Sequence, residues 1–288
     1  MKESIKVFLF LLVLSVAIAA QAPAAAAKLP VDVSEAKLVS KLMGRSMPYR
    51  IILPKNYNSS KQKRYPVIYL LHGLFGSNTN WTTLTKLPSY AQEHEFIIVN
   101  PEGENGWYTD SASKPADRFE SYIIKELIPE IDAKYRTIAA RNGRVIAGLS
   151  MGGYGALKFG VKYPEMFSLA GSFSGALGAA TYTSIPALDA ILKSIGEAYG
   201  PMGSETRKLN DLFALVRDAS PEKIKTLPFI YLDCGTEDFL FQNNREFVEL
   251  LREKKIPHEY RERPGGHAWP YWDGQVAEFL RLAERFVK

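Results

Sequence analysis

A serine between two glycines is the residue of this sequence best suited to covalent chemistry. Gly148-Leu149-Ser150-Met151-Gly152 fits the pattern G-x-S-x-G, follows an apolar run and precedes a segment that can begin a helix. On a sharp turn from strand to helix the serine hydroxyl projects out of the sheet, and larger flanking side chains would collide with the adjoining backbone. The pattern therefore predicts that Ser150 is a nucleophile in acyl transfer. The alternative is a glycine-rich turn with an unreactive serine.

A serine hydroxyl is a weak nucleophile unless a base removes its proton. The sequence contains four histidines, at positions His72, His94, His258 and His267. Hydrolases with this type of turn carry the nucleophile, the acid and the histidine in that order along the chain, which leaves the last two. We expect His267 to be the base, because it follows two glycines in a loop. His258 lies in a strand-like segment and is expected to be structural or exposed.

A carboxylate is needed to orient that histidine. The strand-like segment 229–233 is followed by a loop at 234–238, so the candidates are Asp233, Glu237 and Asp238. Asp233 lies at the strand end, where it can cap the turn, whereas Asp238 lies beyond a glycine and has more freedom to reach a loop histidine. We expect Asp238 to hold the histidine tautomer and to stabilise the imidazolium, with the other two as alternatives.

The segment Leu-Leu-His-Gly-Leu at 70–74 ends the first apolar strand-like run. A His-Gly pair at this place shapes a loop that supplies a donor to the oxyanion of the transition state. We expect the backbone N–H groups of Leu74 and Met151 to be the two donors, and His72 to be structural. The histidines lack H-E-x-x-H spacing, so we expect neither a metal site nor a cofactor.

Aromatic residues are frequent in the predicted loops. We expect Trp107 and Tyr108, which follow Asn105-Gly106, to line the substrate pocket, together with Trp269 and with Ser174 at the end of a predicted strand. Aromatic rings there can stack against an aromatic acyl group or a sugar. The alternative is that they pack the loops.

The elements that must position these residues alternate along the chain. Apolar or β-branched runs predict strands at 47–53, 65–71, 96–99, 144–149, 169–173 and 229–233. A polar run at 258–263 is expected to be an exposed edge strand, and residues 28–45 irregular or edge structure. Helical spacing is found at 121–135, 152–163 and 275–287. This alternation predicts an α/β fold with a mostly parallel sheet and helices on both faces.

Prolines and glycines interrupt the pattern at about 176–227, where we expect a short helical insertion over one end of the sheet. Residues 28–288 are expected to form a single domain. Residues 1–27 have a basic start, an apolar run and a small-residue stretch, which is the order of a signal peptide. Cleavage after Ala22 or Ala27 fits this order, and we expect Ala27 because Pro23 would be an awkward first residue; an uncleaved anchor is the alternative. The protein is therefore expected to be secreted or periplasmic, without stable membrane association after cleavage.

The 288 residues carry a formal charge of +5, with 46% hydrophobic and 23% charged residues, which is typical of a globular protein. The excess basic residues are spread along the chain, so we expect no nucleic-acid partner. The single cysteine, Cys234, excludes an intramolecular disulfide. The sequence does not indicate an oligomeric state.

Considered together, these motifs resemble the esterase D family of α/β-hydrolases, which includes S-formylglutathione hydrolases, tributyrin and feruloyl esterases and mycolyltransferases. The resemblance rests on four segments in family order: Leu-Leu-His-Gly-Leu at 70–74, Gly-Leu-Ser-Met-Gly-Gly-Tyr-Gly-Ala at 148–156, Asp-Cys-Gly-Thr-Glu-Asp-Phe-Leu at 233–240 and Gly-Gly-His-Ala-Trp at 265–269.

The resemblance implies an α/β-hydrolase fold, with Ser150, Asp238 and His267 as the catalytic triad and Leu74 with Met151 as the oxyanion pair. It implies a secreted serine carboxylesterase that acts on short-chain or aromatic acyl esters, either small molecules or esters linked to carbohydrate. The alternatives are an acyltransferase that passes the acyl group to a sugar hydroxyl and a thioesterase similar to S-formylglutathione hydrolase. An inactive binding protein is disfavoured because all three triad residues are present.

Overall fold

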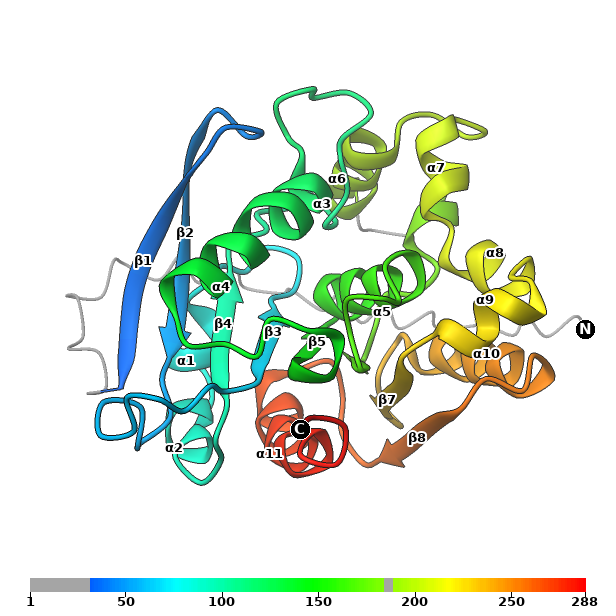
Figure 1. The fold of residues 1–288 in the computed structure, drawn as a ribbon. Helices are drawn as coiled ribbons and strands as arrows, with labels where there is room; N and C mark the ends of the chain where they lie inside the picture. The colour runs from blue at the N-terminus through cyan, green and yellow to red at the C-terminus, as the bar shows by residue number, and fades with distance from the viewer. Residues whose placement is uncertain (1–31, 184–188) are drawn as a thin grey trace, which may run out of the picture.

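A computed structural model describes residues 32–183 and 189–288, which form a sheet with helices on both faces (Figure 1). The eight strands have the spatial order β1-β2-β4-β3-β5-β6-β7-β8. Their bounds are β1 (Val33–Ser40), β2 (Arg45–Ile52), β3 (Val67–Leu71), β4 (Ile97–Pro101), β5 (Arg144–Leu149), β6 (Leu169–Phe173), β7 (Phe229–Gly235) and β8 (His258–Arg263). The predicted signal peptide at 1–27 lies outside the described residues.

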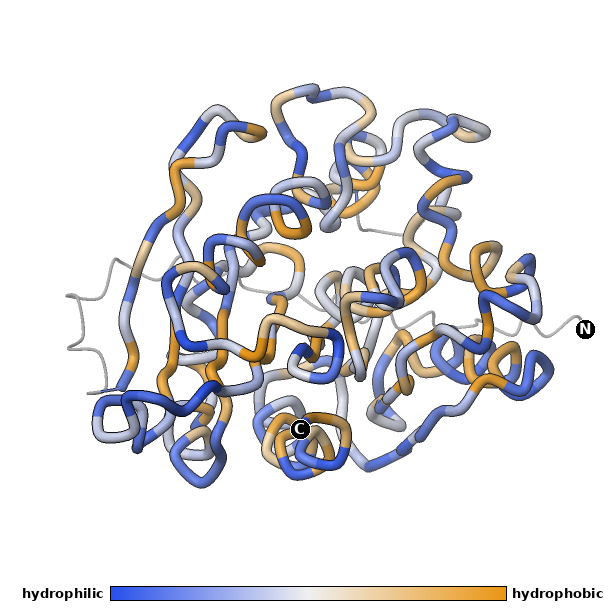
Figure 2. Tube along the Cα trace, viewed as in Figure 1, coloured by the Kyte–Doolittle hydropathy of each residue, from blue (hydrophilic) through white to orange (hydrophobic). Residues whose placement is uncertain are grey.

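The sheet is parallel from β4 to β8, whereas β1 and β2 are antiparallel to their neighbours. The predicted α/β architecture is therefore confirmed. Residues 33–40, for which the sequence left irregular or edge structure open, form the edge strand β1. At the other edge, β8 is polar along its length (Figure 2) and is the exposed strand expected at 258–263.

Side chains on the central strands alternate between two hydrophobic cores, because successive residues of a strand point to opposite faces. In β3, Val67, Tyr69 and Leu71 belong to one core, and Ile68 and Leu70 belong to the other. All five are buried. The first core lies under the helices at 119–122, 128–134, 151–162 and 241–253, and the second lies under those at 80–83, 87–91 and 269–283 (Figure 1). This two-faced burial explains the continuous apolar runs of the parallel strands.

The helices on the two faces agree in part with the predicted ones. Their bounds are α1 (Asn80–Thr83), α2 (Leu87–Ala91), α3 (Phe119–Tyr122), α4 (Ile128–Lys134), α5 (Met151–Lys162), α10 (Phe241–Glu253) and α11 (Trp269–Ala283). A π-helical turn at Ile123–Leu127 joins α3 to α4, so the helix predicted at 121–135 is interrupted. The last helix begins six residues before the predicted 275, with Pro270 in its first turn, where proline is tolerated.

The segment between β6 and β7 is helical, as expected for 176–227. It contains a 3-10 turn at Ala179–Thr181, α6 (Asp189–Tyr199), α7 (Glu205–Asn210), α8 (Leu212–Arg217) and α9 (Pro221–Thr226). These helices lie at the upper and right side of the molecule in Figure 1. Among the helices of the described residues, none is both long and apolar enough to cross a membrane.

Candidate active site

Ser150 lies at the turn between β5 and α5, with a positive φ of 53°. Its backbone is held by hydrogen bonds from its N–H to the Phe173 carbonyl and from the Ala176 N–H to its own carbonyl, at 2.9 and 3.0 Å. A Cβ atom at Gly148 would lie 2.5 Å from the backbone of Gly152. The two glycines of the motif therefore allow the close approach of strand and helix that exposes the serine hydroxyl.

The structure brings together the three side chains expected from the sequence. His267 Nε2 lies 3.0 Å from Ser150 Oγ, and His267 Nδ1 lies 2.9 Å from Asp238 Oδ2. Because the Asp238 carboxylate accepts a hydrogen bond from the Nδ1–H group, Nε2 is left as an acceptor for the serine hydroxyl. The His267 ring is flanked by the rings of Phe239 and Trp272, at 4.6 and 4.9 Å between centroids, which restricts its orientation.

The Asp238 side chain is completely buried. Burial acts to raise the pKa of its carboxyl, but the hydrogen bond and charge of His267 and the Leu240 N–H outweigh burial and hold the pKa below its usual value. The Leu240 N–H donates to Asp238 Oδ1 at 2.8 Å. The carboxylate is therefore ionised and fixed, as a group that orients an imidazole must be.

The alternative acids do not reach the base. Asp233 is completely buried at the end of β7, and burial raises the pKa of its carboxyl to about 7. Glu237 is exposed and accepts hydrogen bonds from the Thr236 hydroxyl and the Gly265 N–H.

The alternative base also lies away from Ser150. His258 pairs with Ile230 at the amino end of the parallel strands β7 and β8, whereas Ser150 follows the carboxyl end of β5. Its Nδ1 lies 2.7 Å from the carbonyl oxygen of Ile256. His258 therefore lies on the edge strand β8, at the opposite end of the parallel strands from Ser150.

The two expected backbone donors both lie beside Ser150. Met151 is the first residue of α5, so its N–H precedes the first hydrogen bond within the helix. Leu74 lines both of the cavities that Ser150 lines, which are described below. Among the hydrogen bonds between described residues, none uses the Leu74 N–H. Both groups are thus available to an oxyanion.

His72 lies behind this loop, where the sequence placed a structural histidine. Its Nδ1 lies 2.8 Å from the Gly73 carbonyl oxygen, and its Nε2 lies 2.9 Å from the Gly103 nitrogen and 3.1 Å from Glu102 Oε1. The imidazole is completely buried, and its hydrogen bonds join the loop after β3 to the loop after β4.

Ser150 lines two cavities. One has a volume of about 370 Å³ and is mostly apolar; it is lined by Leu74, Phe75, Trp107, Ser150, Ala176, Tyr182, Ile191, Phe239, Leu240 and His267. The other has a volume of about 570 Å³ and is more polar; it is lined by Gly73, Leu74, Phe75, Gly76, Asn80, Leu84, Leu149, Ser150, His267, Ala268, Trp269, Pro270 and Trp272.

Two of the four expected pocket residues line these cavities and two do not. Trp107 lines the apolar cavity, where its Nε1–H donates to Ser194 Oγ on α6 at 3.0 Å, and Trp269 lines the second cavity. Tyr108 is instead completely buried, because its hydroxyl donates to the His72 carbonyl at 3.0 Å beneath the loop. Ser174 is also completely buried, since its N–H bonds to the Asp233 carbonyl at the sheet end. The predictions that Tyr108 and Ser174 line the pocket are wrong.

Several lining residues were not found from the sequence. Phe239 and Leu240 directly follow Asp238 in one of the family segments, so their position next to the acid was a usable signal. Tyr182 and Ile191 belong to the segment between β6 and β7 and carried no such signal, because only the folding of that segment brings them to the cavity. Among the described residues, no group of three or more His, Cys, Asp or Glu side chains could hold a metal ion.

Comparisons with known proteins identify the family of the chain. The family model named Esterase matches residues 40–282. The chain is 29% identical to an acetyl esterase of Caldicellulosiruptor saccharolyticus, covering 85% of this chain and 95% of that protein. It is 33% identical to Esterase Rv1288 of Mycobacterium tuberculosis over 76% of this chain, which spans 52% of that protein.

A solved structure of a ferulic acid esterase has 31% sequence identity and a TM-score of 0.76, and the alignment covers 88% of this chain and 98% of the other. The family model covers most of the chain, and the fold agrees with that of a relative above 30% identity. The chain therefore belongs to the Esterase family and is an esterase-D-like serine hydrolase of carboxylic esters.

Proposed function

We propose that this protein is a secreted carboxylesterase that hydrolyses short-chain or aromatic acyl esters through an acyl-enzyme on Ser150. The observation that carries the proposal is the continuous hydrogen-bonded series from Ser150 Oγ through His267 to the buried Asp238 carboxylate. The names of two relatives, an acetyl esterase and a ferulic acid esterase, support the range of acyl groups.

In the proposed reaction, Ser150 Oγ attacks the ester carbonyl while His267 Nε2 takes the hydroxyl proton. The negative charge on the carbonyl oxygen is stabilised by the N–H groups of Leu74 and Met151, each worth roughly 3–4 kcal/mol of the barrier. The intermediate collapses as the alcohol leaves with the proton from His267. Water then attacks the acyl-enzyme, again with His267 as the base, and the carboxylic acid is released.

The two cavities suit the two halves of an ester. We place the acyl group in the apolar cavity, which has Trp107 and Phe239 in its walls and is large enough for an aromatic acid. The alcohol lies in the second cavity, where Trp269 and Asn80 offer an aromatic face and an amide to a hydroxylated leaving group such as a sugar. The aromatic walls thus favour an ester between an aromatic acid and a carbohydrate.

Acyl transfer to a sugar hydroxyl is a second candidate, favoured by the size and polar lining of the alcohol cavity. An added alcohol acceptor would then raise the rate of release of p-nitrophenol and yield a new ester in place of the acid. A hydrolase would give the free acid with or without the acceptor.

The order of basic, apolar and small residues in 1–27 supports export of the protein. N-terminal sequencing of the exported chain is expected to begin at Lys28.

The catalytic proposal is tested with esters of increasing acyl length, methyl ferulate, acetylated xylan and a thioester. We expect Ser150→Ala and His267→Ala each to lower kcat by about 10⁴-fold or more, because the nucleophile and its base act as one unit. The matched control is His258→Ala, which is expected to keep kcat within about twofold. Wild-type turnover by purified, folded Ser150→Ala would refute the proposed nucleophile, and equal losses for the two histidine variants would refute the proposed base.

A further inference from the structure

The loop after β3 is held by side chains from outside it. The N–H groups of residues 75 to 78 all have acceptors. The Phe75 N–H donates to Asn105 Oδ1 at 2.8 Å, and the Asn78 N–H donates to Glu102 Oε2 at 3.1 Å. Between them, the Gly76 N–H donates to the Gly73 carbonyl at 3.1 Å and the Ser77 N–H to Asn80 Oδ1 at 2.8 Å. The Leu74 N–H, just before this series, has no acceptor among residues 32–183 and 189–288.

Phe75 requires an external constraint because its φ is +60°. This left-handed conformation is unfavourable for a residue with a bulky side chain, and it persists only where surrounding contacts impose it. The Phe75 side chain does not supply that constraint, since it is 62% exposed. The hydrogen bond to Asn105 does, because it fixes the peptide plane that joins Leu74 to Phe75.

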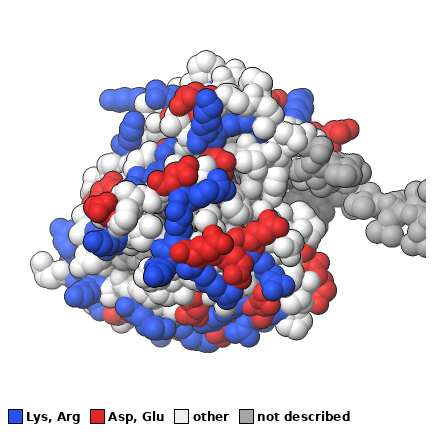
Figure 3. All heavy atoms as spheres, turned by 90° about the vertical axis from the view of Figure 1, so that its right-hand side faces the viewer, with Lys and Arg blue, Asp and Glu red and all other residues white. Residues whose placement is uncertain are grey.

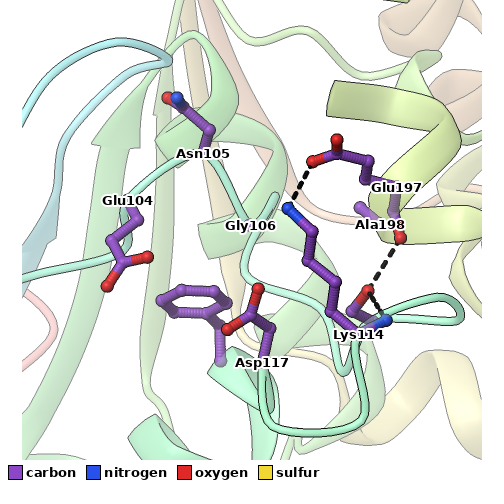
Figure 4. Close-up of a pocket in the computed structure, with 9 residues that line it drawn as sticks. Glu104, Asn105, Gly106, Lys114, Asp117, Glu197 and Ala198 are labelled. Carbon is purple, nitrogen blue, oxygen red and sulfur yellow. Dashed lines mark hydrogen bonds and ion pairs between the residues drawn. The ribbon is translucent and has the colours of Figure 1, made fainter. Parts of the chain in front are cut away.

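Asn105 is itself well placed for this role. It follows β4 in a tight turn in which the Gly106 N–H donates to the Gly103 carbonyl at 3.1 Å. A third cavity lies beneath the turn, and Figure 4 shows the Asn105 side chain pointing away from Asp117 and Lys114, which line the same cavity. Glu104, on its other side, is tied to Arg45 by an ion pair of 3.1 Å. The amide is therefore presented to the loop after β3 and not to the charged cluster.

We propose that Asn105 is a positioning residue for the oxyanion hole: it binds the Phe75 N–H and so holds the Leu74 N–H free beside Ser150. Asn105 lines neither cavity next to the serine, so it acts through the loop and not by contact with substrate. The inference rests on the proposed function, because it takes the Leu74 N–H as an oxyanion donor. Without the amide, the Phe75 backbone can relax and the Leu74–Phe75 peptide plane can turn. The Leu74 N–H lies in the preceding plane, between Gly73 and Leu74, and the compensating rotation about the Leu74 backbone misplaces it.

The test compares Asn105→Ala, Asn105→Asp and the neighbouring control Glu104→Ala with the wild type. We expect Asn105→Ala to lower kcat for p-nitrophenyl acetate about tenfold with KM within about twofold, since misplacing a donor costs less than the 10²–10³-fold of removing one. Asn105→Asp keeps an acceptor oxygen and is expected to stay within about threefold. Glu104→Ala is expected to match the wild type.

A second readout is the inhibition constant of phenylboronic acid, whose tetrahedral serine adduct places an oxygen in the oxyanion hole. We expect Asn105→Ala to raise this inhibition constant by the same factor by which it lowers kcat, because both quantities report on the oxyanion donors. A purely structural role would change the melting temperature or KM without this parallel loss.

Two results separate this inference from the proposed function. If Ser150→Ala abolishes turnover but Asn105→Ala keeps the wild-type kcat and boronate affinity, Asn105 has no positioning role and the inference alone is overturned. An equal loss of kcat in Asn105→Ala and Asn105→Asp would also overturn it, and so would a rise in KM with kcat unchanged. Wild-type protein without turnover on any ester would refute the proposed function and the inference together.

Discussion

Asp233 and Asp238 lie five residues apart and are both buried, yet their electrostatic environments are opposite. Hydrogen bonds from His267 and the Leu240 N–H stabilise the buried Asp238 carboxylate and keep its pKa below the usual value, whereas burial raises the pKa of Asp233 to about 7. Two carboxylates in one short segment therefore differ in protonation near neutral pH. Sequence spacing alone did not separate them, because the difference arises from the groups that face each one in the fold.

We expect Asp238→Asn to lower kcat by about 10³–10⁴-fold, because the amide favours the wrong tautomer of His267. Asp233→Asn is expected to retain activity within about threefold and to change the pH dependence of stability instead. A folded-state pKa raised from 3.8 to about 7 means that the native state binds more protons than the unfolded state in this range. The stability of the wild type therefore falls as pH rises from about 4 to 7.

The measurement is urea unfolding of both variants at pH 5 and pH 8, together with kcat. Relative to the wild type, Asp233→Asn is expected to gain about 3 kcal/mol in free energy of unfolding between these pH values, since each pKa unit corresponds to about 1.4 kcal/mol. A pH-independent difference would contradict the assignment of a titrating carboxyl at Asp233.

At the scale of the element, the parallel strands and the turns that connect them were predictable from the sequence. The turns in which a residue other than glycine has a positive φ were not. The strands were found because burial on both faces requires continuous apolar runs. The positive φ values of Phe75, Trp107 and Tyr108 had no sequence signal, since glycine or asparagine is expected in that conformation. This is why Tyr108 was misplaced in the pocket. Helix α10 was not predicted, although Phe247, Val248 and Leu251 have helical spacing and are buried.

Helix α6 links the segment after β6 to the apolar cavity. Ile191 lines the cavity, while Ser194 accepts the Trp107 indole N–H and the Glu197 carbonyl accepts the Ser111 hydroxyl at 2.7 Å. The position of this helix therefore fixes one wall of the proposed acyl pocket, and its side chains should control acyl length.

We expect Ile191→Phe to narrow this cavity and to lower kcat/KM for butyrate and ferulate esters about tenfold, with acetate changed by less than about twofold. The matched control on the same helix is Lys193→Phe, whose side chain position is exposed. Comparison of kcat/KM across the acyl series checks the prediction. Equal effects on all acyl groups would place the acyl chain elsewhere.

At the scale of the whole molecule, the two cores are covered by a surface of mixed charge. On the face shown in Figure 3, basic and acidic side chains of the described residues are interspersed and not gathered by sign. One ion pair lies inside instead: Lys158 Nζ on α5 is 3.0 Å from a Glu120 carboxylate oxygen on α3, and both side chains are nearly inaccessible to solvent. Lys158 also donates to the Tyr108 carbonyl and to Asn210 Oδ1, at 2.7 and 3.1 Å. This pair joins the sheet-covering helices to α7 and to the loop that carries Trp107.

Glu120 is the carboxylate that pairs with both Lys158 and Lys162. We therefore expect its titration to change the free energy of unfolding of the whole protein. Burial acts to raise its pKa, but the charges of Lys158 and Lys162 outweigh burial and lower the pKa from its usual value of 4.5 to about 2. The unfolded state thus binds more protons between these values. The contribution of Glu120 is fully present above about pH 4.5 and is lost as pH falls toward 2.

We expect Glu120→Gln to lower the free energy of unfolding at pH 7 by about 3 kcal/mol, because it leaves a buried lysine without its counter-charge. The control is Glu205→Gln, which breaks an exposed pair with Lys208 and is expected to cost less than about 0.5 kcal/mol. Urea unfolding at pH 7, 4 and 3 is the measurement. The difference between the wild type and Glu120→Gln is expected to shrink as the pH falls from 4.5 to 3, because the unfolded wild type takes up a proton on Glu120 in this range while the native carboxylate stays ionised. A difference that stays constant down to pH 3 would show that Glu120 stabilises the molecule by packing and not by its charge.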